Sequence, residues 1–136
     1  RAQVCAASPE IAEALHLQEA ETLVCVLMLG LVDAQPVSLA TAYFPHNRFA
    51  GMAAEIARLQ SVTRAFSEYG VADYTRVWTD VTGRTASLEE TTHLRLSAGA
   101  VVLEAASVNA DLQGVPVQFS RSVFSADKIA LRFDTP

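Results

Sequence analysis

Residues 21–32 read ETLVCVLMLGLV, an apolar run that neither a helical nor a two-residue period divides into a polar and an apolar face. Such a short run, apolar on both faces, predicts a strand in the interior of a sheet. The segment 8–17 begins Ser-Pro-Glu, which combines a capping side chain, a proline at the first helical position and an acidic first turn. We therefore expect a short helix, the central strand, a turn over 33–36 and an antiparallel return strand over 37–44.

The same order of elements recurs about eighty residues further along the chain. Segment 87–96 begins Ser-Leu-Glu-Glu, a capping box that predicts a second short helix. An apolar strand over 101–110, a turn over 111–114 and a return strand over 115–124 follow it. Two like units predict two pseudo-symmetric lobes with a ligand cleft at the seam between them.

Helices and one long strand fill the stretch between the two lobes. Apolar residues at helical spacing predict a helix over 49–59, and a second helix over 61–69 is followed by a glycine stop. Weak alternation predicts a linking strand over 71–83, and Ile, Leu and Phe at alternate positions of 129–133 predict a final edge strand. No Gly/Ser-rich linker interrupts the chain. We expect one α+β domain over residues 1–136, with an antiparallel sheet and short helices packed on it.

The composition excludes several classes of protein. The 136 residues are 51% hydrophobic, which is too apolar for a disordered chain. The formal net charge is −5, with 10 Lys and Arg against 15 Asp and Glu, so direct binding to a phosphate backbone is not expected. No apolar stretch reaches the roughly 18 residues of a membrane span. The chain starts at Arg1 without a methionine, and we expect a further domain upstream.

Neither the cysteines nor the histidines form a metal-binding pattern. Cys5 and Cys25 occur without a CxxC motif, and His16, His46 and His93 are scattered. We expect no metal and no other cofactor. Two cysteines in a chain with an ample core fit a reducing cytoplasm better than a disulfide, so free thiols are expected.

No catalytic signature occurs in the sequence. It has no nucleophile elbow, Walker loop, zinc-protease helix or dinucleotide fingerprint. Helix capping explains the adjacent carboxylates of Glu89 and Glu90 better than acid–base chemistry does. Many apolar strands with a modest set of polar groups favour binding over catalysis.

A cluster of hydroxyl and guanidinium groups indicates an anion site. Ser61 and Thr63 lie where the second middle helix begins, and Arg64 is adjacent. Free N–H groups at a helix start attract anions, hydroxyls add donors, and guanidinium groups fit phosphate or phosphonate oxygens. Further arginines lie on or beside later strands: Arg76, Arg84 and Arg121. The alternative is that Ser61 is only a cap and that the arginines are solvated or paired with carboxylates.

Six strings of this sequence carry a resemblance to a known family. They are VDAQPVSLATAYFP (32–45), SVTRAFSEYGVADYTR (61–76), TDVTGR (79–84), LEETTHLRL (88–96), LEAASVNADLQGVPVQFS (103–120) and SVFSADKIALRF (122–133). In this order and spacing they resemble the effector-binding (UTRA) domain of GntR-family, HutC-type transcription regulators. The resemblance is closest to the PhnF-like branch, which is tied to phosphonate or phosphate utilisation, and it covers nearly the whole chain.

The resemblance implies a chorismate-lyase-like fold, an effector cleft between the lobes, and a homodimer. Relatives hold the phosphoryl group of the effector with a Ser-x-Tyr or Ser-x-Thr pair at a helix start, which Ser61 and Thr63 match. In relatives that bind sugar phosphates, a glutamate and an aromatic residue six positions apart close the pocket. Gln118 and Phe124 hold these positions here. Tyr43 is a further candidate for a pocket wall, with core packing as the alternative.

Two positions depart from the family pattern. Relatives that bind sugar phosphates carry two arginines on the first long strand, where this chain has Met28 and Gly30. The departure disfavours a sugar-phosphate effector. We infer that Arg76 of the Asp-Tyr-x-Arg string, followed by Arg84, supplies the missing charge.

The sequence therefore predicts the ligand-sensing domain of a bacterial, cytoplasmic transcription regulator rather than an enzyme. Its partner is a small anionic effector of the phosphonate or phosphate type, and DNA is contacted only through a winged helix-turn-helix domain outside these residues. Two alternatives stay open: a dimerisation module whose ligand site has decayed, and an enzyme related to the chorismate-cleaving lyase. The expected effector contacts are Tyr43, Ser61, Thr63, Arg64, Arg76, Arg84, Gln118, Arg121 and Phe124.

Overall fold

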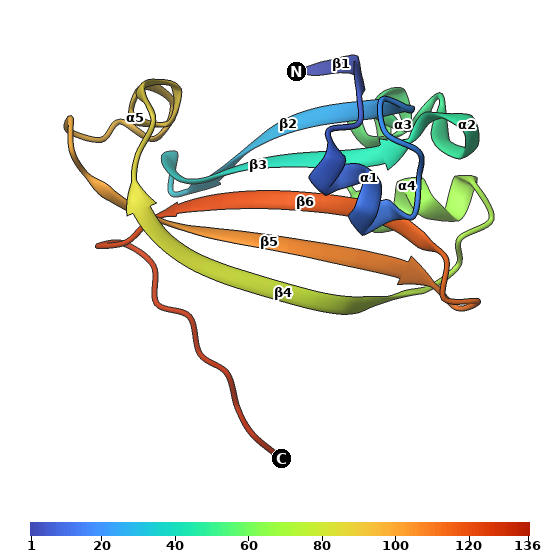
Figure 1. Cartoon of the computed structure of the whole chain (residues 1–136). Helices are drawn as coiled ribbons and strands as arrows, with labels where there is room; N and C mark the ends of the chain where they lie inside the picture. The colour runs from blue at the N-terminus through green and yellow to red at the C-terminus, as the bar shows by residue number, and fades with distance from the viewer.

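The computed structural model describes residues 1–136, which form one antiparallel sheet with short helices packed against it (Figure 1). The elements are, in chain order, β1 (Ala2–Ala6), α1 (Pro9–Leu15), β2 (Thr22–Val32), β3 (Gln35–Pro45), α2 (His46–Phe49), α3 (Met52–Leu59), α4 (Val62–Glu68), β4 (Tyr74–Thr85), α5 (Leu88–Leu94), β5 (Val101–Asp111) and β6 (Pro116–Ser125). The strands lie in the order β1-β2-β3-β6-β5-β4, so the predicted α+β class is confirmed. None of the helices has the length and apolar content that a membrane crossing requires.

The two predicted repeats are two helix–hairpin units that share this sheet. The first unit contains α1, β2 and β3, and the second contains α5, β5 and β6. β3 pairs with β6 from Ser38 opposite Phe124 to Tyr43 opposite Phe119, so backbone hydrogen bonds close the seam between the units. The seam is therefore not a cleft through the sheet, and a ligand site has to lie on one of the two sheet faces.

The helices cover the two faces of the sheet differently. α1 and α5 lie on one face, where Leu15 of α1 packs in one cluster with Phe119 of β6. α2, α3 and α4 lie on the other face, where the rings of Phe44, Phe49 and Phe66 pack at centroid distances of 5.5, 5.7 and 6.2 Å. We call these the α1/α5 face and the α3/α4 face. Figure 1 shows α2, α3 and α4 gathered at one end of the sheet, which leaves the rest of the α3/α4 face without a covering helix.

Serine side chains cap three helices, as the sequence predicts. Ser8, Ser61 and Ser87 each accept a hydrogen bond from the backbone N–H three residues further on, at 3.4, 3.1 and 3.2 Å. The Glu90 carboxylate accepts one in return from the Ser87 amide at 2.8 Å, which completes the predicted capping box. Local hydrogen bonds thus fix where α1, α4 and α5 begin.

The predicted helix over 49–59 is two helices, because the chain leaves the helical path between α2 and α3. A Cβ atom at Gly51 would lie 2.6 Å from the Tyr69 hydroxyl oxygen. Glycine at the break therefore lets the end of α4 pack closely against the start of α3. Pro45 is the last residue of β3 and the cap of α2.

The predicted edge strand over 129–133 is wrong. After β6 the chain makes one turn, in which the Ala126 amide donates to the Val101 carbonyl at 3.2 Å, and the following residues form no strand. Figure 1 shows this C-terminal segment running away from the sheet. A strand needs an unpaired neighbour, and β3 and β5 already occupy both edges of β6.

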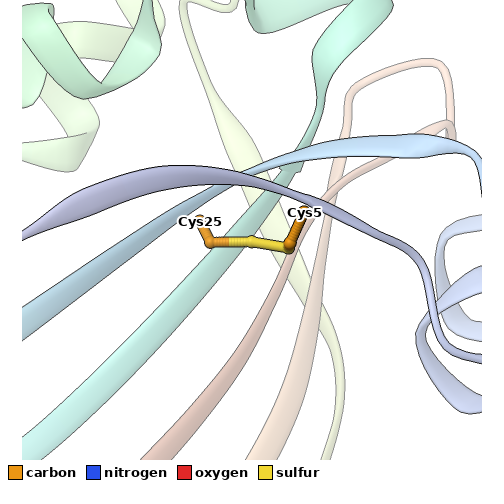
Figure 2. Close-up of a disulfide and its surroundings, with 2 residues drawn as sticks. All are labelled: Cys5 and Cys25. Atoms are coloured by element: carbon orange, nitrogen blue, oxygen red, sulfur yellow. A yellow bond between two sulfur atoms is a disulfide. The ribbon is translucent and has the colours of Figure 1, made fainter.

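The prediction of free thiols is also wrong, because Cys5 and Cys25 form a disulfide (Figure 2). Composition alone does not show that β1 pairs with β2. In the register of that pair Cys5 lies opposite Leu23 and Cys25 lies opposite Gln3, so the cysteines are diagonal neighbours. Their Cα atoms are 6.6 Å apart, which a disulfide can span.

We predict that Cys5→Ser lowers the free energy of unfolding by about 3 kcal/mol, because the cross-link closes a loop between residues 20 positions apart. Cys5 is the better target, since Cys25 is buried and a serine there would add a desolvated hydroxyl. Urea unfolding with and without dithiothreitol measures the effect. Reductant should destabilise the wild type to the level of the variant and leave the variant unchanged; equal stability of all four samples would contradict the prediction.

Candidate functional site

The uncovered part of the α3/α4 face carries polar side chains from β4, β5 and β6. Residues directly opposite each other in an antiparallel pair share a face. Thr79 pairs with Ser107 and Ser107 with Ser120, so these three hydroxyls form one row across the sheet. We call the whole set the polar floor, and it consists of Thr79, Ser107, Asn109, Gln118, Ser120 and Ser122.

Arg76 lies at the edge of the polar floor and is held there by neutral groups. Its Nε donates to Asn109 Oδ1 at 2.7 Å, and its Nη1 donates to Thr79 Oγ1 at 3.1 Å. Asn109 Nδ2 donates in turn to Gln118 Oε1 at 3.0 Å, and Gln118 Nε2 donates to Ser120 Oγ at 2.8 Å. The guanidinium is thus oriented but not neutralised, and its Nη2 amino group remains free for an anion.

The start of α4 reaches the same strand through a pair of hydroxyls. Thr63 Oγ1 lies 2.6 Å from the Tyr74 hydroxyl oxygen, and Tyr74 precedes Arg76 by two positions on β4. Ser61 accepts the Arg64 amide proton as the α4 cap, which leaves its own hydroxyl proton free to donate. Thr63 at the start of α4 is therefore in contact with β4, the strand that carries Arg76.

An apolar pocket of about 600 Å³ opens between β2 and the helices α3 and α4. Ser61 lines it, and Val26 and Met28 supply part of its wall on the sheet side. Met28 pairs with Ala40 of β3, and Ala40 pairs with Ser122, so the pocket and the polar floor are neighbours on the α3/α4 face. The other lining side chains include Ala53, Ile56, Ala57, Gln60 and Val62.

Six of the nine predicted contact residues belong to this side of the sheet. Gln118 is buried in the hydrogen-bonded chain of the polar floor. Phe124 pairs with Ser38 and Leu103 on the same face. Arg64 is exposed on α4, where its Nη1 donates to the Leu59 carbonyl at 3.5 Å and no carboxylate pairs with it. The other three on this side are Ser61, Thr63 and Arg76.

The remaining three predicted contacts lie on the α1/α5 face and are not brought together with the others. Tyr43 packs against Phe119 at a ring-centroid distance of 6.0 Å. Arg121 is hydrogen-bonded to Glu10 of α1. Arg84 belongs to an ion-pair cluster with α5. Strand alternation explains the separation, because Arg121 lies between two residues of the polar floor and must point to the opposite face.

The Arg84 cluster fastens α5 to the sheet. Arg84 donates to both carboxylate oxygens of Glu90 at 2.7 Å and to Glu104 at 2.9 Å. The hydrogen bond from Arg84, helped by the Ser87 amide, holds the pKa of Glu90 below its ordinary value despite burial. The same contact with Glu90 raises the pKa of Arg84. All three groups therefore stay charged, and the two carboxylates neutralise Arg84, which leaves it unavailable to a ligand.

Sequence reasoning missed Ser107, Asn109, Ser120 and Ser122. The sequence does contain a pattern that indicates them. Ser107 and Asn109 alternate with apolar neighbours within the strand predicted as apolar over 101–110. In β6 the polar residues Ser120 and Ser122 likewise alternate with residues of the other face. Alternation along β5 and β6, taken separately for the two faces of the sheet, predicts the polar floor.

We predict that Glu90→Gln lowers the free energy of unfolding at pH 7 by about 1–3 kcal/mol, since it breaks a partly buried ion pair. A carboxylate whose folded-state pKa is lowered stabilises the fold above its unfolded pKa, and this contribution is lost as the pH falls through the folded value. The wild type should therefore lose more stability than the variant as the pH drops below about 4.3.

Urea unfolding between neutral and acidic pH checks this expectation. Glu89→Gln is the matched control, because its side chain is 57% exposed whereas that of Glu90 is 12% exposed. The same pH dependence for wild type and Glu90→Gln would contradict the role of the cluster.

Comparison with known proteins identifies the fold and the family. A model of the UTRA domain matches residues 1–130. An HTH-type transcriptional regulator of Rhizobium meliloti is 47% identical over 129 residues, which are 95% of this chain and 53% of that protein. The chain thus spans about half the length of this curated relative.

Two solved structures share the fold. The ligand-binding domain of a GntR-family transcriptional regulator from Bordetella bronchiseptica superposes with a TM-score of 0.84 at 23% identity, covering 100% of this chain and 88% of that one. PhnF from Mycobacterium smegmatis gives a TM-score of 0.83 at 18% identity, over 97% of this chain and 58% of that one.

These matches are regulators and regulator domains, not enzymes, so the lyase alternative is not supported. The predicted chorismate-lyase-like architecture agrees with the antiparallel sheet and its short helices. Because the family model covers residues 1–130, and because the regulator that is 47% identical matches 95% of the chain, this chain belongs to the UTRA domain family.

Proposed function

We propose that this chain senses a small anionic effector of the phosphonate or phosphate type on the α3/α4 face. In the full-length regulator, a homodimer in the bacterial cytoplasm would pass the signal to winged helix-turn-helix domains that bind DNA. One observation carries the proposal. The Arg76 guanidinium donates hydrogen bonds to the Asn109 amide and the Thr79 hydroxyl, and no carboxylate pairs with it.

The charges of the candidate arginines favour Arg76 as the anion ligand. Arg84 and Arg121 are paired with carboxylates, whereas Arg76 and Arg64 are not, and of these two only Arg76 is held by the polar floor. A guanidinium with a free amino group binds phosphonate oxygens in a charge-assisted manner. Because Asn109 and Gln118 are buried and hydrogen-bonded to each other, they hold Arg76 in one orientation and reduce the entropy lost on binding.

The neighbouring groups fit the rest of such an effector. Hydroxyls of Thr63, Tyr74 and Ser120 lie along the same face as further donors. The apolar pocket beside Met28 fits a hydrocarbon substituent better than the hydroxyl-rich ring of a sugar, because buried hydroxyls need partners. Because β3, β6 and β5 separate the strand of this pocket from β4, only a phosphonate long enough to cross the polar floor would use both Arg76 and the pocket.

An effector at Arg76 would act on two elements at once. It would contact β4 directly and reach α4 through the Thr63–Tyr74 pair. A ligand shifts a conformational equilibrium only by its difference in affinity for the two states. Here the states would differ in how closely the start of α4 approaches β4.

A second candidate function is an effector-independent dimerisation module. It is favoured by Met28 and Gly30, which stand where relatives that bind sugar phosphates carry arginines. An anion screen separates the two candidates, since a decayed site would bind none of the compounds.

We predict that inorganic phosphate or a small alkyl- or arylphosphonate raises the melting temperature of the wild type, and that Arg76→Gln weakens its binding at least about tenfold. Glutamine can still donate to Asn109, so the substitution removes the charge and retains a neutral donor. Thermal shift identifies the ligand, and isothermal titration calorimetry measures the dissociation constant. Arg58→Gln is the matched control, because that arginine is exposed on α3 and paired with Glu55.

Ser61→Asp tests the other side of the site. Aspartate is a good helix cap, so α4 should keep its start, whereas its negative charge should repel the anion and abolish measurable binding. Unchanged affinity in both Arg76→Gln and Ser61→Asp would place the ligand elsewhere. Absence of binding by every anion in the wild type would favour the dimerisation module.

A further inference from the structure

Two cysteines join the edge strand β1 to the rest of the sheet. Cys5 of β1 and Cys25 of β2 form the disulfide on the α1/α5 face, where they belong to or pack against the cluster of Leu15 and Phe119 (Figure 2). Structural disulfides are dense in small domains that cannot build a sufficient core. Here three clusters of buried apolar side chains pack on the sheet, so the core does not require a cross-link.

Little besides the disulfide holds the first half of β1. The strand ends the sheet and pairs only with β2, and residues 1–4 are all exposed. The ion pair between Arg1 and Glu89 is exposed on both sides and contributes little. Just after the strand, Ala7 is buried and donates to the Glu21 carbonyl at 2.8 Å. The disulfide therefore lies between an anchored end and an exposed end of β1.

The two halves of the disulfide differ in exposure. Cys5 is partly exposed, whereas Cys25 is buried. A surface groove of about 190 Å³, whose lining includes Gln3, Cys25 and Tyr43, reaches the bond from the α1/α5 face. Thiol–disulfide exchange requires that an attacking thiolate can reach a sulfur atom. A small thiol can therefore attack Cys5 while the chain stays folded.

We propose that the Cys5–Cys25 disulfide is a reversible redox switch, opened by cytoplasmic thiols and closed by a peroxide, and that its reduction releases the first half of β1. Disulfides of cytoplasmic proteins are usually transient and redox-sensing. This role rests on the proposed function only for the cytoplasmic location. Arg1 and Ala2 line the apolar pocket, and the Leu27 amide of its wall donates to the Arg1 carbonyl at 2.7 Å. Release of β1 would therefore uncover this side of the pocket.

The chemistry of the switch is a two-electron exchange. In reduction, a thiolate attacks Cys5 Sγ, the S–S bond breaks, and Cys25 leaves as a thiolate that takes up a proton. A second thiolate attacks the reductant's sulfur in the mixed disulfide, which releases the Cys5 thiolate and joins the two reductant sulfurs. In oxidation, the Cys5 thiolate takes an oxygen from hydrogen peroxide to give a sulfenic acid and water. The Cys25 thiol then displaces a second water and restores the disulfide.

Reduction of the folded chain tests the switch. The wild-type chain is treated with thioredoxin, thioredoxin reductase and NADPH, with and without urea, and free thiols are counted by alkylation and mass spectrometry. We expect two free thiols in the folded chain, and none after hydrogen peroxide is added in place of the reductant. A bond that is reduced only when urea unfolds the chain is a structural staple and overturns the proposal. Two thiols that peroxide does not join overturn it as well.

Amide hydrogen exchange followed by NMR tests the release of β1. The Leu27 amide should exchange at least about tenfold faster in the reduced chain than in the oxidised chain, whereas the amides of β5 serve as the reference and should not change. Cys5→Ser should behave like the reduced wild type and should not respond to peroxide. Equal exchange at Leu27 in both redox states, or equal acceleration in β5, overturns the release of β1. These measurements need no anion, so they and the titrations on Arg76 variants can fail separately.

Discussion

Side-chain alternation along β5 and β6 decides which polar residues of this chain can meet. Ser120 and Ser122 point to the α3/α4 face, and Arg121 between them points to the face of α1. The constraint is strict, because a shift of one residue in register would exchange the two sets. It separates Arg121, which is already neutralised by Glu10, from Arg76, which has no carboxylate partner, although only β5 lies between their strands.

The two faces consequently have different physical roles. On the α1/α5 face charges are paired, as in the cluster of Arg84, Glu90 and Glu104, and they join a helix to the sheet. In the polar floor of the α3/α4 face the polar groups are joined by neutral hydrogen bonds, so an arriving anion meets donors and positive charge there rather than a carboxylate. Arg76 is exposed to solvent, so its neutral partners orient the guanidinium without neutralising it.

Sequence predicts those features that depend on near neighbours. The caps at Ser61 and Ser87, the central strand over 22–32 and the repeated hairpins follow from local hydrogen bonds and periodicity. The disulfide depends on the β1–β2 register, which joins segments some twenty residues apart, and composition carries no trace of it. The alternating pattern at 129–133 is present, yet a strand also needs an open edge, and the chain offers it none next to β6.

β4 is the element on which the proposed effector would act directly. Its register with β5 shifts between Arg76 and Trp78, which marks a bulge at Val77. A bulge bends a strand and re-aims its side chains, so Arg76 faces the polar floor whereas Trp78 faces the opposite side of the sheet. An anion drawn to Arg76 would therefore act at this bend, next to the contact that Tyr74 makes with Thr63 at the start of α4.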